Sequence, residues 1–216
     1  MSFRIRAARV DDLQHLYEMA KLTGGGFTNL PADRDSLTQK LERSERAYQS
    51  DSNAHGDDLF VMVLENVETG AVRGTSQLFT KVGQTWPFYS YRLSTLSQTS
   101  KELNRTFSAQ MLGLVTDLEG ASEVGGLLAR SRYLFIKEHR ERFGDKIFAE
   151  LRGIIDEAGG SPFWDGLAGR FFGMSFQEAD YFNAIHGNQF IADLMPKHPI
   201  YTAMLSETAR AAIGIP

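Results

Sequence analysis

The chain has no cysteine among its 216 residues. This absence excludes disulfides, thiol nucleophiles and cysteine-ligated zinc, and it fits a reducing compartment. Long apolar runs are also missing, because the longest, such as residues 59–64, are far shorter than the roughly 20 residues that cross a bilayer. The start Met-Ser-Phe-Arg lacks the apolar region of a signal peptide. We therefore expect a cytoplasmic protein that makes no membrane contact.

The sequence has no large excess of either charge. Lys and Arg number 23 and Asp and Glu number 27, which gives a net charge of −4 and a pI near 5.8. Proteins that bind phosphate backbones need clustered cationic charge, so we expect no nucleic-acid partner. The share of hydrophobic residues, 42%, is ordinary for a globular chain with its own core.

Familiar catalytic signatures are absent as well. The sequence has no Walker A run, no G-x-G-x-x-G, no H-E-x-x-H and no G-x-S-x-G, so the common kinase, dehydrogenase, metalloprotease and hydrolase classes lose support. The histidines lie far apart without the spacing of metal ligands. They are His15, His55, His139, His186 and His198. We predict neither a metal site nor a tightly bound cofactor.

Hydrophobic periodicity predicts a β-α-α-β-β order in the first 80 residues. Period-two alternation and apolar runs indicate strands, and apolar positions three and four apart indicate helices. The expected elements are a strand over 3–7, helices over 13–20 and 37–48, a strand over 59–65, a turn at 68–70 and a returning strand over 71–80. The pattern is that of an α/β or α+β protein with a mixed, mostly antiparallel sheet flanked by helices.

The remainder of the chain has weaker periodicity. Residues 83–107 are aromatic and polar and are expected to form a loop with one irregular strand. Later elements are predicted as strands over 111–116 and 147–155, and as helices over 127–139, from Ser161-Pro162 onward, over 177–185 and over 206–213. No repeat or linker interrupts the sequence, so we expect a single domain over residues 1–216.

Two groups of polar residues could carry chemistry. Asp117, Glu119 and Glu123 gather where a strand pair should end, where carboxylates can hold a cation or accept a proton from an attacking amine. Solvated turn charges are the simpler explanation of this group. Arg130 stands early on a predicted helix that follows Gly125 and therefore beside N–H groups that could bind phosphate, although arginine is also an ordinary residue on a helix surface.

Several longer sequence words add a specific resemblance. They stand in order over nearly the whole chain, and they are KLTGGGFTNLP at 21–31, PFYSYR at 87–92, SKEL at 100–103, RSRYLF at 130–135, ELRG at 150–153, DE at 156–157, SPFW at 161–164 and FIADLMPKHPIY at 190–201. Together they resemble the arginine N-succinyltransferases. That family is similar to the GNAT acyltransferases, whose fold opens in the β-α-α-β-β order predicted above. The resemblance implies transfer of succinyl from succinyl-CoA to the α-amino group of L-arginine, the first step of arginine degradation.

The resemblance also implies which residues meet succinyl-CoA, the co-substrate. The pyrophosphate would rest on N–H groups before the helix over 127–139, flanked by Gly125 and Gly126. Leu127 aligns with the family's succinyl-CoA contact, and Arg130 lies one turn further along the same helix.

Arginine as the acceptor requires charged partners of both signs. Glu123 and Asp117 are candidates for the guanidinium, and Arg92 is the candidate for the α-carboxylate. The succinyl carboxylate needs a further cation, for which Arg152 or Lys101 is available. Glu123 is the expected catalytic base.

Two departures from the family pattern affect these expectations. Between Gly126 and Leu127 the family carries a strand end and a glycine-rich loop that this sequence lacks, so the chain as printed is expected to bind CoA weakly. The family also continues past Pro216 into a histidine proposed as proton donor and a further C-terminal portion.

An acyltransferase for ornithine or another amine, and a non-catalytic subunit that pairs with an active paralogue, remain alternatives. The aromatic residues at 86–91 and 163–172 suggest an oligomer, of like or unlike chains.

Overall fold

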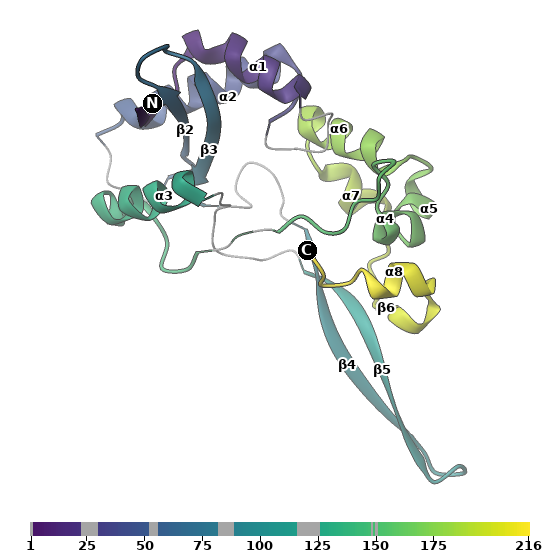
Figure 1. The fold of residues 1–216 in the computed structure, drawn as a ribbon. Coiled ribbons are helices and arrows are strands. Elements are labelled where there is room, and N and C mark those ends of the chain that lie inside the picture. The colour runs from purple at the N-terminus through teal and green to yellow at the C-terminus, as the bar shows by residue number, and fades with distance from the viewer. Residues whose placement is uncertain are drawn as a thin grey trace. The chain divides into compact units, whose positions relative to one another are not determined.

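The computed structural model describes residues 2–22, 30–51, 56–81, 89–115, 126–147, 149 and 151–216. The chain forms two compact units. Unit 1 comprises residues 1–86, 119–151 and 180–186, and unit 2 comprises residues 87–118, 152–179 and 187–216. Each is described by itself, and the elements are labelled in Figure 1. The single domain over residues 1–216 stays a prediction.

Unit 1 contains an antiparallel sheet in the order β1-β2-β3. Its strands are β1 (Phe3–Ala7), β2 (Leu59–Asn66) and β3 (Val72–Phe79). The turn between β2 and β3 is fixed by the side-chain oxygen of Asn66, which accepts hydrogen bonds from the N–H groups of Glu68 and Thr69. Gly70 adopts φ of 71°, a left-handed conformation that glycine accepts without strain. The predicted strand-turn-strand is confirmed.

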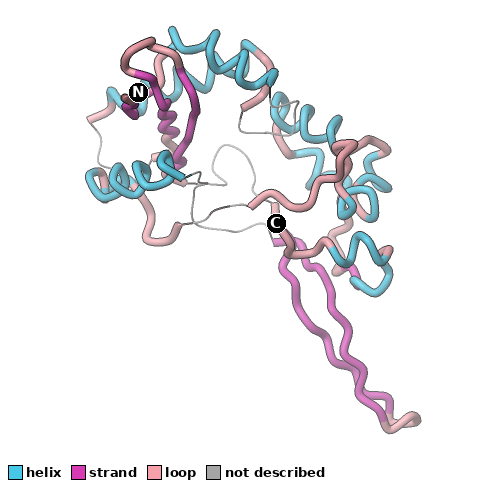
Figure 2. Tube along the Cα trace, in the orientation of Figure 1, coloured by secondary structure: helices cyan, strands magenta, loops and turns pink. Residues whose placement is uncertain are grey.

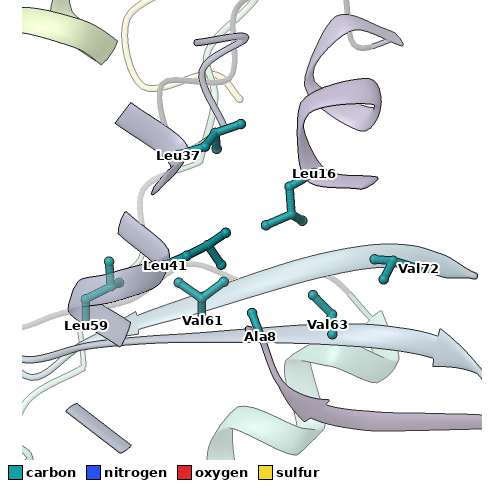
Figure 3. Close-up of a cluster of buried hydrophobic side chains, with 8 residues drawn as sticks. All are labelled: Ala8, Leu16, Leu37, Leu41, Leu59, Val61, Val63 and Val72. Atoms are coloured by element: carbon teal, nitrogen blue, oxygen red, sulfur yellow. The ribbon is translucent and has the colours of Figure 1, made fainter. Parts of the chain in front are cut away.

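Two helices cover one face of this sheet. They are α1 (Leu13–Leu22), which follows the 3-10 turn η1 (Val10–Asp12), and α2 (Arg34–Gln49). Asp33 caps α2 by accepting the Ser36 N–H at 2.8 Å. Figure 3 shows the core between the helices and the sheet. Its residues are Ala8, Leu16, Leu37, Leu41, Leu59, Val61, Val63 and Val72. The predicted β-α-α-β-β opening is confirmed.

The other face of β2 is buried as well. Because successive side chains alternate across a strand, Phe60 and Met62 point away from Val61 and pack with Leu78 and Phe143. Helix α3 (Gly126–Glu138) contributes Phe135 to this second cluster. Burial on both faces explains why β2 is a continuous apolar run.

Unit 2 is built on a long hairpin. Its strands are β4 (Ser90–Ser100) and β5 (Arg105–Val115), drawn in magenta in Figure 2. They pair without interruption from Ser90 opposite Val115 to Ser100 opposite Arg105. A short third strand, β6 (Ile200–Tyr201), pairs with Met111 and Leu112 of β5. The prediction of a loop with one irregular strand over 83–107 is right about the presence of a strand and wrong about its regularity, because β4 pairs without a bulge. β5 begins six residues before the predicted strand over 111–116.

Short helices of unit 2 pack against the base of this hairpin. They are α4 (Pro162–Gly166), α5 (Gly169–Phe172) and α7 (Gln189–Leu194). The 3-10 turn η3 (Thr202–Met204) contacts β5, and α8 (Glu207–Ala211) packs on α4. Helix α6 (Phe176–His186) has residues in both units, and the 3-10 turn η2 (Arg140–Arg142) belongs to unit 1. Ser161 caps α4, and Pro162 occupies its first position, as predicted. Leu112, Leu167, Ala168 and Met195 form the core of unit 2.

The predicted strand over 147–155 is wrong for the residues of that range that the structure describes. Among the described residues of this range, Ile147 takes part in a bridge, and residues 151–155 belong to no strand or helix. Leu151 is 73% exposed and Ile154 is 41% exposed. A segment with alternating apolar residues forms a strand only where a neighbouring strand can pair with it and a core can bury its apolar side chains.

Candidate functional site

The start of α3 in unit 1 is a candidate binding point for an anion. The helix has 13 residues, begins at Gly126 and carries no acidic residue in its first turn. The first N–H groups of any α-helix lack partners within the helix and carry partial positive charge. Gly125 precedes the helix in the sequence and has no side-chain oxygen that could cap these groups. The first turn can therefore offer N–H donors to a ligand.

Arg130 adds a full positive charge near this helix start. Its side chain is exposed, whereas Arg132 on the same helix is only 3% exposed. Lys137 is also exposed but lies in the last turn, at the opposite end of the helix. Of these cations, Arg130 is therefore the one whose exposed charge lies toward the N-terminal end.

An aromatic cluster holds the C-terminal half of α3 in place. The Phe135 ring centroid lies 4.8 Å from that of Phe60 and 5.7 Å from that of Tyr48. Arg142 lies over Phe60 at 4.7 Å and donates to Asp58 Oδ2 at 2.9 Å. These contacts fix the direction of the helix, and with it the direction in which its first N–H groups point.

The buried side of α3 excludes one of its large apolar residues. Phe135 and Ile136 pack against the core, whereas Leu134 is 65% exposed. Positions 132, 135, 136 and 139 lie on one side of a helix, and Leu134 lies outside that stripe. The buried stripe includes Arg132. The exposed His139, just beyond the helix end, lies with its ring centroid 4.4 Å from that of Phe135.

Arg92 in unit 2 presents a guanidinium to solvent. It lies on β4 opposite Gly113 of β5, which has no side chain to cover it, and its own side chain is exposed. Within the described ranges, Arg92 has no ion pair or hydrogen bond. Its five N–H donors are therefore available for a carboxylate, which arginine binds in a two-point geometry.

The two other cations expected to bind substrate lie in different surroundings. Arg152 is exposed, and its guanidinium lies 5.9 Å from the ring centroid of Phe176. Lys101 lies in the turn at the hairpin tip. At about 3.3 Å per residue, nine residues of strand place Lys101 roughly 30 Å from Arg92. Lys101 and Arg92 therefore cannot contact the same small molecule.

Tyr91 is a candidate that the sequence did not single out. It packs against the core of unit 2, and its hydroxyl is buried without a hydrogen-bond partner in the described part of the chain. Burial raises the pKa of Tyr91 to about 12, so the phenol stays protonated and can donate. In the sequence it is one of several aromatic residues, and nothing marks its hydroxyl as unpaired.

Three of the predicted site residues, Asp117, Glu123 and Gly125, lie outside the described residues. Gly126, Leu127 and Arg130 are described in α3 of unit 1, and Arg92 and Arg152 are described in unit 2.

No group of His, Asp and Glu side chains suited to a metal ion occurs within the described ranges. None of the described helices combines the length and apolar character that crossing a membrane requires.

Comparison with known proteins identifies the family of this chain. Residues 3–216 match the family described as arginine N-succinyltransferase beta subunit. The chain belongs to this family. An arginine N-succinyltransferase of Citrobacter koseri and one of Salmonella schwarzengrund are each 42% identical to it over 224 residues, which cover 97% of this chain. The fold is the GNAT-like acyltransferase fold that the resemblance implied.

A solved structure gives the same result for the fold. The arginine/ornithine succinyltransferase subunit AI from Pseudomonas aeruginosa is 29% identical, with a TM-score of 0.89 over 99% of this chain and 66% of that one. The chain spans 65% of the length of the two curated relatives. Their matched stretch of 224 residues is longer than this whole chain of 216, so within that stretch the relatives carry residues that this chain lacks.

Proposed function

We propose that this chain serves the transfer of a succinyl group from succinyl-CoA to the α-amino group of L-arginine. The observation that carries the proposal is the family match over residues 3–216, in a chain whose α3 begins at a glycine with no acidic residue in its first turn. Succinyl-CoA is consumed as a co-substrate, and no tightly bound cofactor is required.

CoA binding is assigned to the start of α3. The pyrophosphate accepts hydrogen bonds from the N–H groups at Gly125, Gly126 and Leu127, and Arg130 adds a positive charge one turn along. The anchored aromatic cluster supports this role, because a fixed helix keeps its N–H groups aligned. A shorter connection before α3 than the relatives have would leave fewer backbone donors, so we expect weak CoA binding by the chain as printed.

The reaction needs a neutral amine, a polarised carbonyl and a protonated leaving group. The α-amino nitrogen attacks the thioester carbonyl carbon, a C–N bond forms, and the C–S bond breaks. The amine loses a proton to Glu123, the proposed base, and the CoA thiolate gains one. The products are a succinyl amide of arginine and free CoA.

Charged residues then orient the two substrates. Asp117 pairs with the guanidinium of the acceptor, and Arg92 with its α-carboxylate. Arg152 takes the succinyl carboxylate, and Lys101 is set aside because it lies at the hairpin tip. The exposure of Arg92 and Arg152 supports these roles.

Substitution of Arg130 tests the CoA assignment. In Arg130→Ala the KM for succinyl-CoA should rise several-fold with little change in kcat, because a contact made equally in the ground and transition states is lost. Lys137→Ala is the matched control, since it removes an exposed cation from the far end of the same helix. Equal effects of the two substitutions, or none, would remove Arg130 from the site.

Glu123→Gln separates the two roles that a carboxylate could have there. If Glu123 is the base, kcat falls and its pH dependence changes; if it only binds the guanidinium, the KM for arginine rises with kcat nearly constant. If neither parameter moves, Glu123 is a solvated turn residue and has no place in the site.

Ornithine is a second acceptor to test, because the Pseudomonas aeruginosa relative is described as an arginine/ornithine succinyltransferase subunit. Ornithine carries an ammonium group where arginine carries a guanidinium, and an ammonium does not form the two parallel hydrogen bonds of a guanidinium-carboxylate pair. We expect arginine to have the higher kcat/KM if Asp117 binds the side chain. Asp117→Ala should then reduce the preference between the two acceptors.

A further inference from the structure

The outer edge of β4 has none of the features that normally protect an exposed strand. β4 is at one end of the β4-β5-β6 sheet, so among the described residues no strand pairs with its outer edge. From Leu93 to Ser100 it has no charged residue, no proline and no glycine. Its pairing with β5 runs without a bulge. Natural proteins block such edges with charges, prolines or bulges, because unpaired N–H and C=O groups are a template for another strand.

The far half of the hairpin also lacks a core of its own. Tyr91 and Leu112, both near its base, are the hairpin residues that enter the core cluster of unit 2. β6 pairs only with Met111 and Leu112. Figure 1 shows the far half of the hairpin extending beyond β6 and α8. A two-stranded ribbon without a third layer or strand is marginally stable in water.

The two faces of this half differ in chemistry. One face carries hydroxyl groups, with Ser97 and Ser108 hydrogen bonded at 3.0 Å and Thr99 and Thr106 at 3.0 Å. The other face is mixed, with Leu96, Phe107, Ala109 and Met111 interspersed with Ser94, Gln98, Ser100 and Arg105. Phe107 is 49% exposed. Adding strands at the edge would extend both faces.

We propose that two copies of this chain pair through their β4 edges, antiparallel, about a two-fold axis at Leu96. The four strands then form one continuous sheet in the order β5-β4-β4-β5. This inference does not depend on the proposed enzymatic activity. The interaction surface lies on unit 2, and its partner is a second copy of the chain.

The register explains why a second copy fits. A two-fold axis perpendicular to the sheet keeps each face on its own side, so the side chains of one face meet side chains of the same face of the partner subunit. Leu96 lies opposite Leu96 of the partner subunit. Thr95 lies opposite Ser97 of the partner subunit, and Leu93 lies opposite Thr99 of the partner subunit.

Charge supports self-pairing as well. When identical strands pair, any charge near the axis comes close to its own copy, and like charges directly opposite are destabilising. The run from Leu93 to Ser100 has none, and the nearest charges, Arg92 and Lys101, lie beyond the paired stretch. A second copy of β4 therefore meets no repulsion, and it supplies backbone partners to the whole uncharged edge.

Paired lysine substitutions on the two strands test the surface. Thr95→Lys with Ser97→Lys places introduced ammonium groups opposite one another across the axis. The matched control is Ser108→Lys with Gln110→Lys, because these residues are the direct cross-strand partners on the same hairpin. We expect a dimer for the unmodified chain and for the control, and a dissociation constant raised about tenfold or more for the β4 variant. Sedimentation velocity over a concentration series measures this. A monomeric unmodified chain, or equal effects of both variants, would overturn the proposal.

Single cysteines test the register, and the chain has no natural cysteine to interfere. In Leu96→Cys the two introduced cysteines lie opposite each other at roughly 5 Å between Cα atoms, within the range of disulfides. Ala109→Cys is the control, because Ala109 lies opposite Leu96 on β5 and away from the axis. Mild oxidation should give a covalent dimer of the first variant and not of the second. No cross-link in the Leu96 variant, or equal cross-linking of both, would contradict the arrangement.

Discussion

At the residue scale, an ion-pair group ties the start of the chain to the sheet of unit 1. Arg6 donates to both carboxylate oxygens of Asp12, at 2.7 Å and 2.8 Å, and to Glu65 at 2.5 Å. Burial alone would raise the pKa of Asp12, but hydrogen bonds from Arg6 and from the Arg9 N–H outweigh it and hold the pKa below its ordinary value. Hydrogen bonds from Arg4 and Arg6 lower the pKa of Glu65 in the same way.

These shifts predict acid destabilisation of unit 1. A carboxylate whose pKa is lower in the folded state contributes stability above its unfolded pKa, which is about 4, and loses that stability as pH falls through the folded pKa. The free energy of unfolding should therefore drop below about pH 4. Asp12→Asn should lower the free energy of unfolding by roughly 2 kcal/mol at neutral pH and weaken its dependence on pH in the acid range. Urea unfolding at several pH values measures both effects, and Asp11→Asn, at an exposed neighbour, is the control. If Asp12→Asn leaves the pH dependence of the free energy of unfolding unchanged in the acid range, this ion-pair group does not couple stability to pH.

The unpaired hydroxyl of Tyr91 gives a second residue-scale prediction. Removing a buried hydroxyl that lacks a partner costs no hydrogen bond, so Tyr91→Phe should leave the free energy of unfolding unchanged or raise it by up to about 1 kcal/mol. Tyr48→Phe is the control, because the Tyr48 hydroxyl donates to the Val61 carbonyl at 3.4 Å, and it should cost about 0.5–1 kcal/mol. Urea unfolding of both variants without ligand decides this. A clear loss of stability in Tyr91→Phe would mean that its hydroxyl has a partner.

At the element scale, the elements that could be predicted from the sequence are those whose burial follows the same pattern from one end to the other. β2 is apolar throughout because both of its faces are buried, and α2 repeats its apolar positions because one side meets β2. The extent and regularity of β4 could not be predicted, because its far half packs on no core that would make its side chains alternate between apolar and polar. The segment at 151–155 was misassigned for the opposite reason, since it is apolar but has no ladder partner. In both segments the structure depends on contacts with other segments of the chain, which the local sequence pattern does not show.

The cap of α2 gives a prediction at this scale. Asp33 accepts the Ser36 N–H at 2.8 Å, and hydrogen bonds from the Ser36 side chain and from this N–H lower the pKa of Asp33. Asp33→Ala should destabilise unit 1 by about 1 kcal/mol, the usual cost of losing an N-cap. Asp35→Ala, which removes an exposed carboxylate from the same first turn, should cost only a few tenths of a kcal/mol by weakening the interaction with the helix dipole. Thermal unfolding compares the two, and equal losses would show that charge rather than the cap hydrogen bond matters.

At the scale of the whole molecule, the candidate site draws on distant parts of the sequence. The start of α3 could be predicted, because glycines before a periodic helix are a local signal. The exposure of Arg92 opposite Gly113, and the separation of Lys101 from it, depend on hairpin register and could not be read from periodicity. The assignment of succinyl-CoA and arginine came from the sequence words, and the family match over residues 3–216 supports it.

The most direct test of the central claim is product analysis by mass spectrometry. The protein is incubated with succinyl-CoA and L-arginine, and arginine is examined while free CoA thiol is followed. The account predicts arginine that carries one added succinyl group on its α-amino nitrogen, with one CoA thiol released for each product formed. Unmodified arginine at high protein concentration, even where calorimetry detects bound CoA, would contradict the account and indicate a non-catalytic subunit. Equal use of acetyl-CoA would contradict the assignment of the succinyl donor.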